Sequence, residues 1–238
     1  MTKEVYLDSI PESYKIKEVG RGANGVCYRT EAGKLFKHYF SQMDERFYLP
    51  LKDICDYSHS ENLPQIIEMI FVQGNFDGYL RDYVDGTTIK ELDLNTKVKP
   101  FIPAIKTFGM NMRDDIRTGI QYRDMHSENV IYTPDGQIKV IDYDLFYRTY
   151  DDMFFRDDLM YAFRVELSPT MLSLLMGSTE TGIPYIDALR TKCTSRYENP
   201  IRPDQAYEEI INYLERELQT NIETFNDVRE GISLLRKK

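Results

Sequence analysis

Hydrophobic periodicity changes near residue 85 of this 238-residue chain. Before that point, short runs such as residues 14–19 alternate apolar and polar side chains and are separated by glycine-containing turns, a pattern typical of half-buried strands. After it, apolar residues recur at helical spacing, as at Ile105, Phe108 and Met112. The chain is therefore predicted to be an α+β protein in which a small antiparallel sheet with one helix precedes a larger helical part.

The element boundaries follow from the same periodicities and from turn residues. Ser41 is the expected N-cap of the helix in the first part. The turn Thr-Pro-Asp-Gly at residues 133–136 separates two short strands. Strands are expected over residues 14–19, 26–30, 34–39, 66–72, 78–84, 130–132 and 138–141. Helices are expected over residues 41–57, 103–118, 156–176, 182–193 and 203–236, with a further helical pattern starting over 88–92.

Composition and charge narrow the class of protein. The net charge of −9 argues against a general affinity for nucleic acid or anionic membranes. No apolar stretch approaches the ~18 residues of a membrane span, and the first residues lack the apolar run of a signal peptide. The three cysteines are far apart and form no metal-binding pattern, which favours free thiols. A cytoplasmic protein is the expectation.

Two carboxylates and one amide form the most informative constellation. Asn129 follows Asp124 by five residues, and Asp142 follows Asn129 by thirteen. Apolar residues after Asn129 and before Asp142 predict strands that hold these positions. Oxygen ligands of this kind suit Mg²⁺, and a carboxylate is a sufficient base for a loose phosphoryl-transfer transition state. Taken singly each residue is an ordinary turn former, but together they predict a phosphoryl-transfer site.

A glycine-rich segment precedes this constellation. Residues 20–26, Gly-Arg-Gly-Ala-Asn-Gly-Val, match the pattern G-x-G-x-x-G-x-V in full. Glycine permits unusual backbone geometry and lets amide groups approach phosphate oxygens closely. The same pattern opens a helix in dinucleotide-binding folds, but here strand-like residues flank it on both sides, which favours a glycine-rich hairpin.

Together these segments resemble the protein-kinase-like superfamily, whose catalytic loop reads H-R-D-x-x-x-x-N and is followed by D-F-G. The resemblance implies a single bilobal kinase-like domain over residues 1–238, with an N-lobe at 1–84 and a C-lobe at 85–238. It implies Asp124 as the base, Asn129 and Asp142 as Mg²⁺ ligands, and Lys37 as the lysine that contacts the ATP phosphates. Lys34 is the competitor for Lys37. The remaining implied nucleotide-binding residues are Gly20, Gly22, Gly25, Val26, Glu45 as the acid partner of Lys37, and Asp82, Tyr83 and Val84 in the hinge. Glu61 and Asp53 are the alternatives to Glu45.

Several residues depart from the protein-kinase pattern. Tyr122 replaces the first His of the catalytic loop, and Arg81 stands where the family usually has an apolar residue behind the adenine. His126 and Asp144 resemble the D-x-H-x-x-N and D-x-D motifs of aminoglycoside and choline kinases. In contrast, residues 156–159, Arg-Asp-Asp-Leu, resemble a helix start of casein-kinase-like protein kinases, in which Asp158 would brace the catalytic loop.

The resemblance therefore implies a Mg²⁺·ATP-dependent phosphotransferase that acts on a hydroxyl, with a protein Ser/Thr favoured as acceptor. A small-molecule kinase of the aminoglycoside or choline type remains open. A pseudokinase that binds nucleotide without turnover is a further alternative, motivated by Arg81 and by the short spacing between Lys37 and Glu45. The last alternative is an unrelated α+β protein in which the pattern is accidental.

Overall fold

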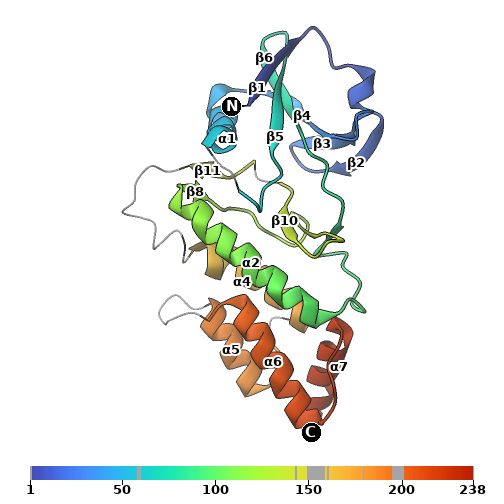
Figure 1. The fold of residues 1–238 in the computed structure, drawn as a ribbon, viewed down its shortest axis with the longest axis vertical. Coiled ribbons are helices and arrows are strands. Elements are labelled where there is room, and N and C mark those ends of the chain that lie inside the picture. The colour runs from blue at the N-terminus through green and yellow to red at the C-terminus, as the bar shows by residue number, and fades with distance from the viewer. Residues whose placement is uncertain are drawn as a thin grey trace.

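A six-stranded mixed sheet and a helical region make up the molecule, which we describe from a computed structural model (Figure 1). The structure describes residues 2–57, 60–142, 144–148, 159, 161–178, 180–194 and 201–237. In these residues the N-terminal sheet lies at one end of the long axis, and six helical segments follow it in the chain, most of them at the other end. The predicted α+β class is confirmed.

The N-terminal sheet has the strand order β1-β5-β6-β4-β3-β2. Neighbouring strands are antiparallel except for β1, which pairs in parallel with β5. The prediction of a purely antiparallel sheet was therefore wrong, because β1 was not anticipated. The strands are β1 (Lys3–Leu7), β2 (Lys17–Arg21), β3 (Gly25–Arg29), β4 (Leu35–Met43), β5 (Ile66–Val72) and β6 (Asn75–Arg81). A short 3-10 helix, η1 (Glu12–Tyr14), occupies the start of the segment predicted as the first strand.

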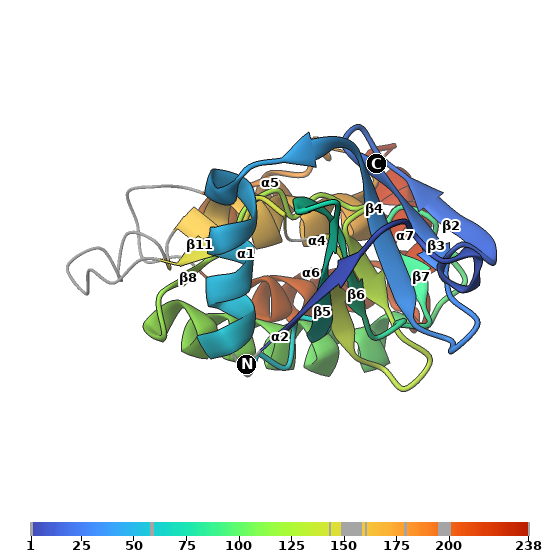
Figure 2. The same ribbon diagram turned by 90° about the horizontal axis from the view of Figure 1, so that it is seen from above.

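Helix α1 (Glu45–Tyr57) packs beside the sheet (Figure 2). Strand β4 continues to Met43, so Ser41 lies in a strand and is not the helix cap that we expected. Asp44 takes this place, since its Oδ1 atom accepts a 3.0 Å hydrogen bond from the Arg46 amide. Leu51 and Ile54 on α1 are buried in the core.

Short strands lie between the N-terminal sheet and the helices. Strand β9 (Val130–Tyr132) pairs with both β7 (Thr87–Thr88) and β10 (Ile138–Val140), and β8 (Ile120–Gln121) pairs with β11 (Tyr147–Arg148). The helical pattern predicted over residues 88–92 was wrong. Thr87 and Thr88 are extended instead, because β7 pairs with β9, and a turn follows in which the Glu91 amide donates to the Thr88 carbonyl at 3.0 Å.

The C-terminal helical region differs from the predicted helices chiefly in the start of its first helix and in a break within its last. Helix α2 begins five residues before Pro103, which the sequence suggested as its first turn. The helix predicted over 203–236 is two helices, because Gln219 adopts a left-handed φ of 53° and a capping box joins Thr224 to Asp227. Residues 156–158 lie outside the described part. The segments are α2 (Val98–Arg117), the π-helix η3 (Ala162–Leu167), α4 (Ser168–Met176), α5 (Pro184–Thr194), α6 (Pro203–Leu218) and α7 (Phe225–Leu235).

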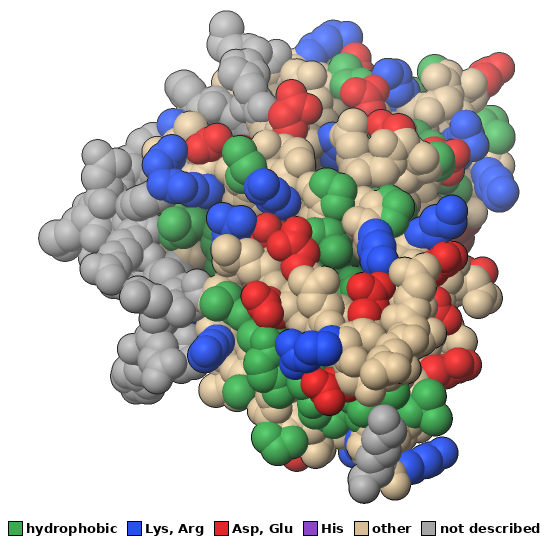
Figure 3. Space-filling view, turned by 60° about the horizontal axis from the view of Figure 1, so that its bottom comes forward, with side chains coloured by type: hydrophobic (Ala, Val, Ile, Leu, Met, Phe, Trp, Pro, Cys, Tyr) green, Lys and Arg blue, Asp and Glu red, His purple; other side chains and the backbone are tan. Residues whose placement is uncertain are grey.

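The core of the helical region forms around α2. Its apolar stripe, including Phe101, Phe108 and Met112, is buried, and the Phe101 ring lies 5.2 Å from the Phe225 ring of α7. Cys27, Cys55 and Cys193 are free thiols. Within the described residues, no helix has the length and apolar character needed to cross a bilayer. On the face drawn in Figure 3, acidic and basic side chains are intermixed.

Candidate functional site

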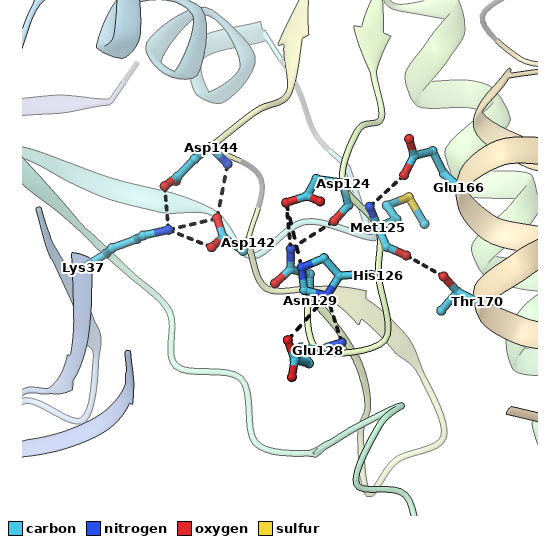
Figure 4. A network of polar contacts seen from close by, with 10 residues as sticks. All are labelled: Lys37, Asp124, Met125, His126, Glu128, Asn129, Asp142, Asp144, Glu166 and Thr170. Carbon is cyan, nitrogen blue, oxygen red and sulfur yellow. Dashed lines mark hydrogen bonds and ion pairs between the residues drawn. The ribbon is translucent and has the colours of Figure 1, made fainter. Parts of the chain in front are cut away.

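Segments far apart in the chain meet between the N-terminal sheet and the helical region (Figure 4). Lys37 comes from the middle of β4, Asp124 and Asn129 from the loop between β8 and β9, and Asp142 from the end of β10. The Ile141 amide donates a 2.8 Å hydrogen bond to the Asn129 carbonyl, which places Asn129 beside Asp142. The structure therefore brings together four residues that the sequence singled out.

Lys37 is buried and binds two carboxylates. Its Nζ atom lies 2.9 Å from each oxygen of Asp142 and 2.5 Å from Asp144 Oδ2. Burial lowers the pKa of Lys37, but the carboxylates of Asp144 and Asp142 outweigh that effect and raise the pKa above its ordinary value. Burial, reinforced by Asp142, raises the pKa of Asp144, because one ammonium cannot fully compensate two carboxylates. Lys37 is thus held as a cation by the two carboxyl groups.

The expected acid partner of Lys37, Glu45, is not the one that the structure provides. Glu45 is an exposed residue at the start of α1, and among the described residues Lys37 forms ion pairs only with Asp142 and Asp144. This corrects the Glu45 assignment. The physical reason is the length of β4, which runs on to Met43 and carries the start of α1 away from Lys37. Lys34, the competing lysine, pairs with Asp82 at 2.6 Å near the surface.

The Asp124 loop is held in an unusual backbone conformation. Asp124 has a φ of 55°, in the left-handed region that few residues other than glycine, Asn and Asp adopt. Asn129 Nδ2 donates to the Asp124 carbonyl at 3.0 Å and approaches its Oδ2 atom at 3.4 Å. His126 Nε2 lies 3.9 Å from the same oxygen, and both side chains are exposed. The Asp124 carboxylate is therefore oriented by an amide and open to solvent.

Glu166 and Thr170, which the sequence did not single out, hold this loop through the backbone of Met125. Met125, the residue after Asp124, donates its amide hydrogen to Glu166 Oε2 at 2.8 Å. Thr170 Oγ1 donates to the Met125 carbonyl at 2.7 Å. Glu166 lies in the π-helical segment and Thr170 in α4, which follows it directly. One continuous helical segment therefore binds both the amide and the carbonyl of Met125 (Figure 4). Asp158, predicted for this bracing role, lies outside the described residues.

Tyr122 anchors the other end of the loop. Its ring is fully buried, and its hydroxyl donates to the Asp115 carboxylate on α2 and accepts from Asn62 Nδ2 at 3.2 Å. Ser60 donates to the same Asp115 oxygen at 2.5 Å. Burial raises the pKa of Asp115 to about 6. The tyrosine that replaces the histidine of the kinase pattern thus belongs to a polar network that ties the loop to α2.

The glycine-rich segment is a hairpin between β2 and β3, as predicted. Its turn is closed by a 2.9 Å hydrogen bond from the Gly22 amide to the Gly25 carbonyl. Gly25 is required by packing, because a Cβ atom there would lie 2.4 Å from the His38 carbonyl oxygen. Nothing lies within 4 Å of a Cβ at Gly20 or Gly22. Val26, the last residue of the motif, is buried in the sheet.

The predicted hinge residues link the sheet to the helical region. Asp82, Tyr83 and Val84 lie between β6 and β7 without regular structure. Arg81 is 2% exposed and donates to the Asp82 carbonyl at 2.9 Å and to the Ile141 carbonyl at 3.0 Å. Arg81 therefore ties the start of the predicted hinge to the residue before Asp142. The Arg29 guanidinium covers the Tyr83 ring at 4.6 Å.

Arg123 is enclosed by aromatic rings. Its guanidinium lies 4.1 Å from the Tyr161 ring centre and 5.4 Å from that of Tyr147. It also donates to the Tyr147 hydroxyl at 3.0 Å. Cation–π contacts of this kind stabilise the positive charge of the Arg123 guanidinium. Thr149 and Tyr150, which offer further hydroxyls nearby in sequence, lie outside the described residues.

The donor set fits a magnesium ion that phosphates help to hold. No group of three or more His, Cys, Asp or Glu in the described residues could hold a metal alone. Mg²⁺, however, is usually bound by one or two protein oxygens together with substrate phosphates. Asn129 and Asp142 supply two such side chains side by side, and in Figure 4 the Asn129 side-chain oxygen points away from Asp124.

No protein-family model matches the sequence, and no curated protein matches it.

Proposed function

We propose that the chain is a Mg²⁺·ATP-dependent phosphotransferase with a bilobal, protein-kinase-like fold. The observation that carries the proposal is the convergence of Lys37, Asp124, Asn129 and Asp142 from three separate segments. The glycine-rich hairpin on the neighbouring strands supports it. So does the passage of the chain from sheet to helical region at residues 82–86, which agrees with a division into lobes at 1–84 and 85–238.

In this proposal Asp124 orients the acceptor hydroxyl and takes its proton on a carboxylate oxygen. The hydroxyl oxygen forms a bond to the γ-phosphorus, and the bond between that phosphorus and the bridging oxygen breaks, which leaves ADP. Asn129 keeps Asp124 in position through its amide. Lys37 donates to the phosphates, and Asn129 and Asp142 offer oxygens to Mg²⁺. The metal ion, when bound, neutralises charge on the phosphates.

We favour a protein Ser/Thr hydroxyl as the acceptor, in a cytoplasmic enzyme, with ATP and the acceptor as its partners and neither nucleic acid nor membrane among them. A small-molecule acceptor is the second candidate. The observation that favours it is the exposed His126 beside Asp124, at 3.9 Å, which adds a polar imidazole next to the acceptor position. A folded peptide substrate would have to avoid this ring, whereas a compact polyol or aminoglycoside could bind to it.

The test is phosphate transfer from labelled ATP to a panel of proteins, peptides, aminoglycosides and choline. Asp124→Ala serves as the inactive control. Label on protein alone, or on small molecules alone, selects the acceptor class. Binding of Mg²⁺·ATP without transfer to any acceptor would favour a pseudokinase. Absence of nucleotide binding would overturn the proposed function.

A further inference from the structure

Lys37 obtains its carboxylate partner from the segment after β10 and not from helix α1. We infer that Asp144 is a positioning residue that holds Lys37 in place for the nucleotide phosphates, so that α1 contributes no charged group to the site. The inference rests on the proposed function and deepens it. It assigns to Asp144 a role distinct from that of Asp142, although both now contact the same ammonium group.

The two carboxylates differ in their surroundings. The Asp144 side chain is 5% exposed and receives a 3.2 Å hydrogen bond from the Tyr79 hydroxyl on β6. The Asp142 side chain is 40% exposed. Asp144 is therefore fixed in the interior beside Lys37, whereas Asp142 borders solvent, where a hydrated cation can reach it.

Charge balance explains why the site holds both acids. A buried ammonium that loses its only carboxylate is strongly destabilised. If Asp142 were the sole carboxylate partner of Lys37, its transfer to a metal ion would leave the nucleotide phosphates as the only counter-charge of that ammonium. With Asp144 at 2.5 Å, Lys37 keeps one partner while Asp142 turns to the cation. Asp144 therefore lowers the free-energy cost of moving Asp142 from Lys37 to the metal ion.

The alternative partner on α1, Glu45, lies beyond the end of β4. From Lys37 to Met43 the chain stays in one strand. The pairing of this strand with β6 shifts between His38 and Met43, so that Met43 lies opposite Phe76 whereas Lys37 lies opposite Tyr79. Glu45 follows only after this strand ends, and its side chain is exposed. Displacement of α1 would therefore leave the Lys37–Asp144 ion pair intact.

The experiment compares Asp144→Asn with Glu45→Gln, alongside Lys37→Met and the double variant Lys37→Met/Asp144→Asn. Mg²⁺·ATP affinity is measured by calorimetry, and kcat and KM for ATP by phosphate transfer. We expect Asp144→Asn to weaken nucleotide affinity about tenfold, because it removes the charge-assisted contact that holds Lys37 in place for the phosphates. Glu45→Gln should stay within about twofold of the wild type, since an exposed charge contributes little.

The double variant separates positioning from a merely structural role. If Asp144 acts through Lys37, the double variant binds nucleotide no more weakly than Lys37→Met alone. A structural role would instead add a further loss on the Lys37→Met background. Near-ultraviolet circular dichroism of the ligand-free proteins checks that each variant is folded. Should Asp144→Asn fail to fold, Tyr79→Phe removes only the hydroxyl that holds Asp144, and a smaller loss of affinity, about threefold, is expected.

The inference is overturned if Asp144→Asn, or Tyr79→Phe in its place, binds nucleotide like the wild type, or if Glu45→Gln loses as much affinity as Lys37→Met. In both cases the wild type still binds Mg²⁺·ATP, so the proposed function stands. A wild-type protein that binds no Mg²⁺·ATP would instead overturn the proposed function and, with it, this inference.

Discussion

The backbone amide of Met125 donates a 2.8 Å hydrogen bond to Glu166 Oε2, across a sequence separation of 41 residues. Through this contact a carboxylate in the π-helical segment η3 sets the position of the residue next to Asp124. Since Asp124 itself is in the left-handed region, its side-chain direction depends on how firmly its neighbours are held.

Removal of this brace is expected to reduce catalysis more than binding. Glu166→Ala should lower kcat about tenfold to a hundredfold, because a hydrogen bond to a charged acceptor contributes about 1.5–3 kcal/mol. Glu166→Gln keeps an acceptor oxygen and should lose less. Val165→Ala, at an exposed neighbouring position, is the matched control. Equal kcat values for Glu166→Ala and this control would exclude the bracing role.

The proposed base gives a sharper prediction. Asp124→Asn keeps the size of the side chain and removes its capacity to accept a proton. We expect kcat to fall about 10²- to 10⁴-fold, the usual contribution of a positioned base, while Mg²⁺·ATP affinity changes little. Asp114→Asn, on the exposed face of α2, serves as the control carboxylate. Undiminished turnover in Asp124→Asn would show that Asp124 is not the base.

The buried Asp115 predicts a pH dependence of stability. Its pKa is raised from 3.8 to about 6 by burial, so the folded state holds this proton more tightly than the unfolded state does. The Asp115 contribution to the free energy of unfolding therefore falls as pH rises from about 4 to about 6, and is constant above that range. The fall amounts to about 3 kcal/mol.

Urea unfolding between pH 4 and 7.5 measures this effect. Asp115→Asn cannot titrate and keeps an oxygen that accepts from Tyr122 and Ser60, so the part of the slope due to Asp115 should vanish in the variant. Wild type and Asp115→Asn with parallel stability curves over this range would contradict the assignment.

Gly78 on β6 predicts a large effect on stability. A Cβ atom at this position would lie 1.9 Å from the Lys37 carbonyl oxygen, so the two central strands would have to separate. Gly78→Ala should lower the free energy of unfolding by about 1–3 kcal/mol. Gly20→Ala, where a Cβ meets nothing within 4 Å, is the matched control and should unfold at nearly the wild-type urea concentration. Similar midpoints for both variants would argue against this packing.

The sequence predicted the sheet and the site where local signals were strong. Alternation over residues 26–30 and the turn at 133–136 located β3 and the β9–β10 hairpin closely, whereas β4 runs four residues beyond the predicted 34–39. Residues that share one loop, such as Asp124 and Asn129, were also grouped correctly. These features depend on short-range geometry, which spacing in the sequence encodes.

Other features depend on contacts between distant segments and could not be predicted in this way. The resemblance places the acid partner of Lys37 on the helix that follows its strand, which suggests Glu45, whereas Asp144, the residue that contacts Lys37, lies 107 positions away. Glu166 lies in a helical pattern that gives no hint of its contact with Met125. The break between α6 and α7 did have a signal, the capping box at Thr224 and Asp227, which the long apolar periodicity outweighed.

The pairing of strand β1 with β5 delays part of the sheet until well after β1 has been synthesised. Among the described residues, strand β1 pairs with β5, which begins at Ile66, so β1 leaves the ribosome long before this partner does. Contacts of high sequence separation form late and slow folding. Until β5 emerges, the nascent chain carries an unsatisfied strand, and this interval is when a chaperone or a neighbouring chain can compete for it.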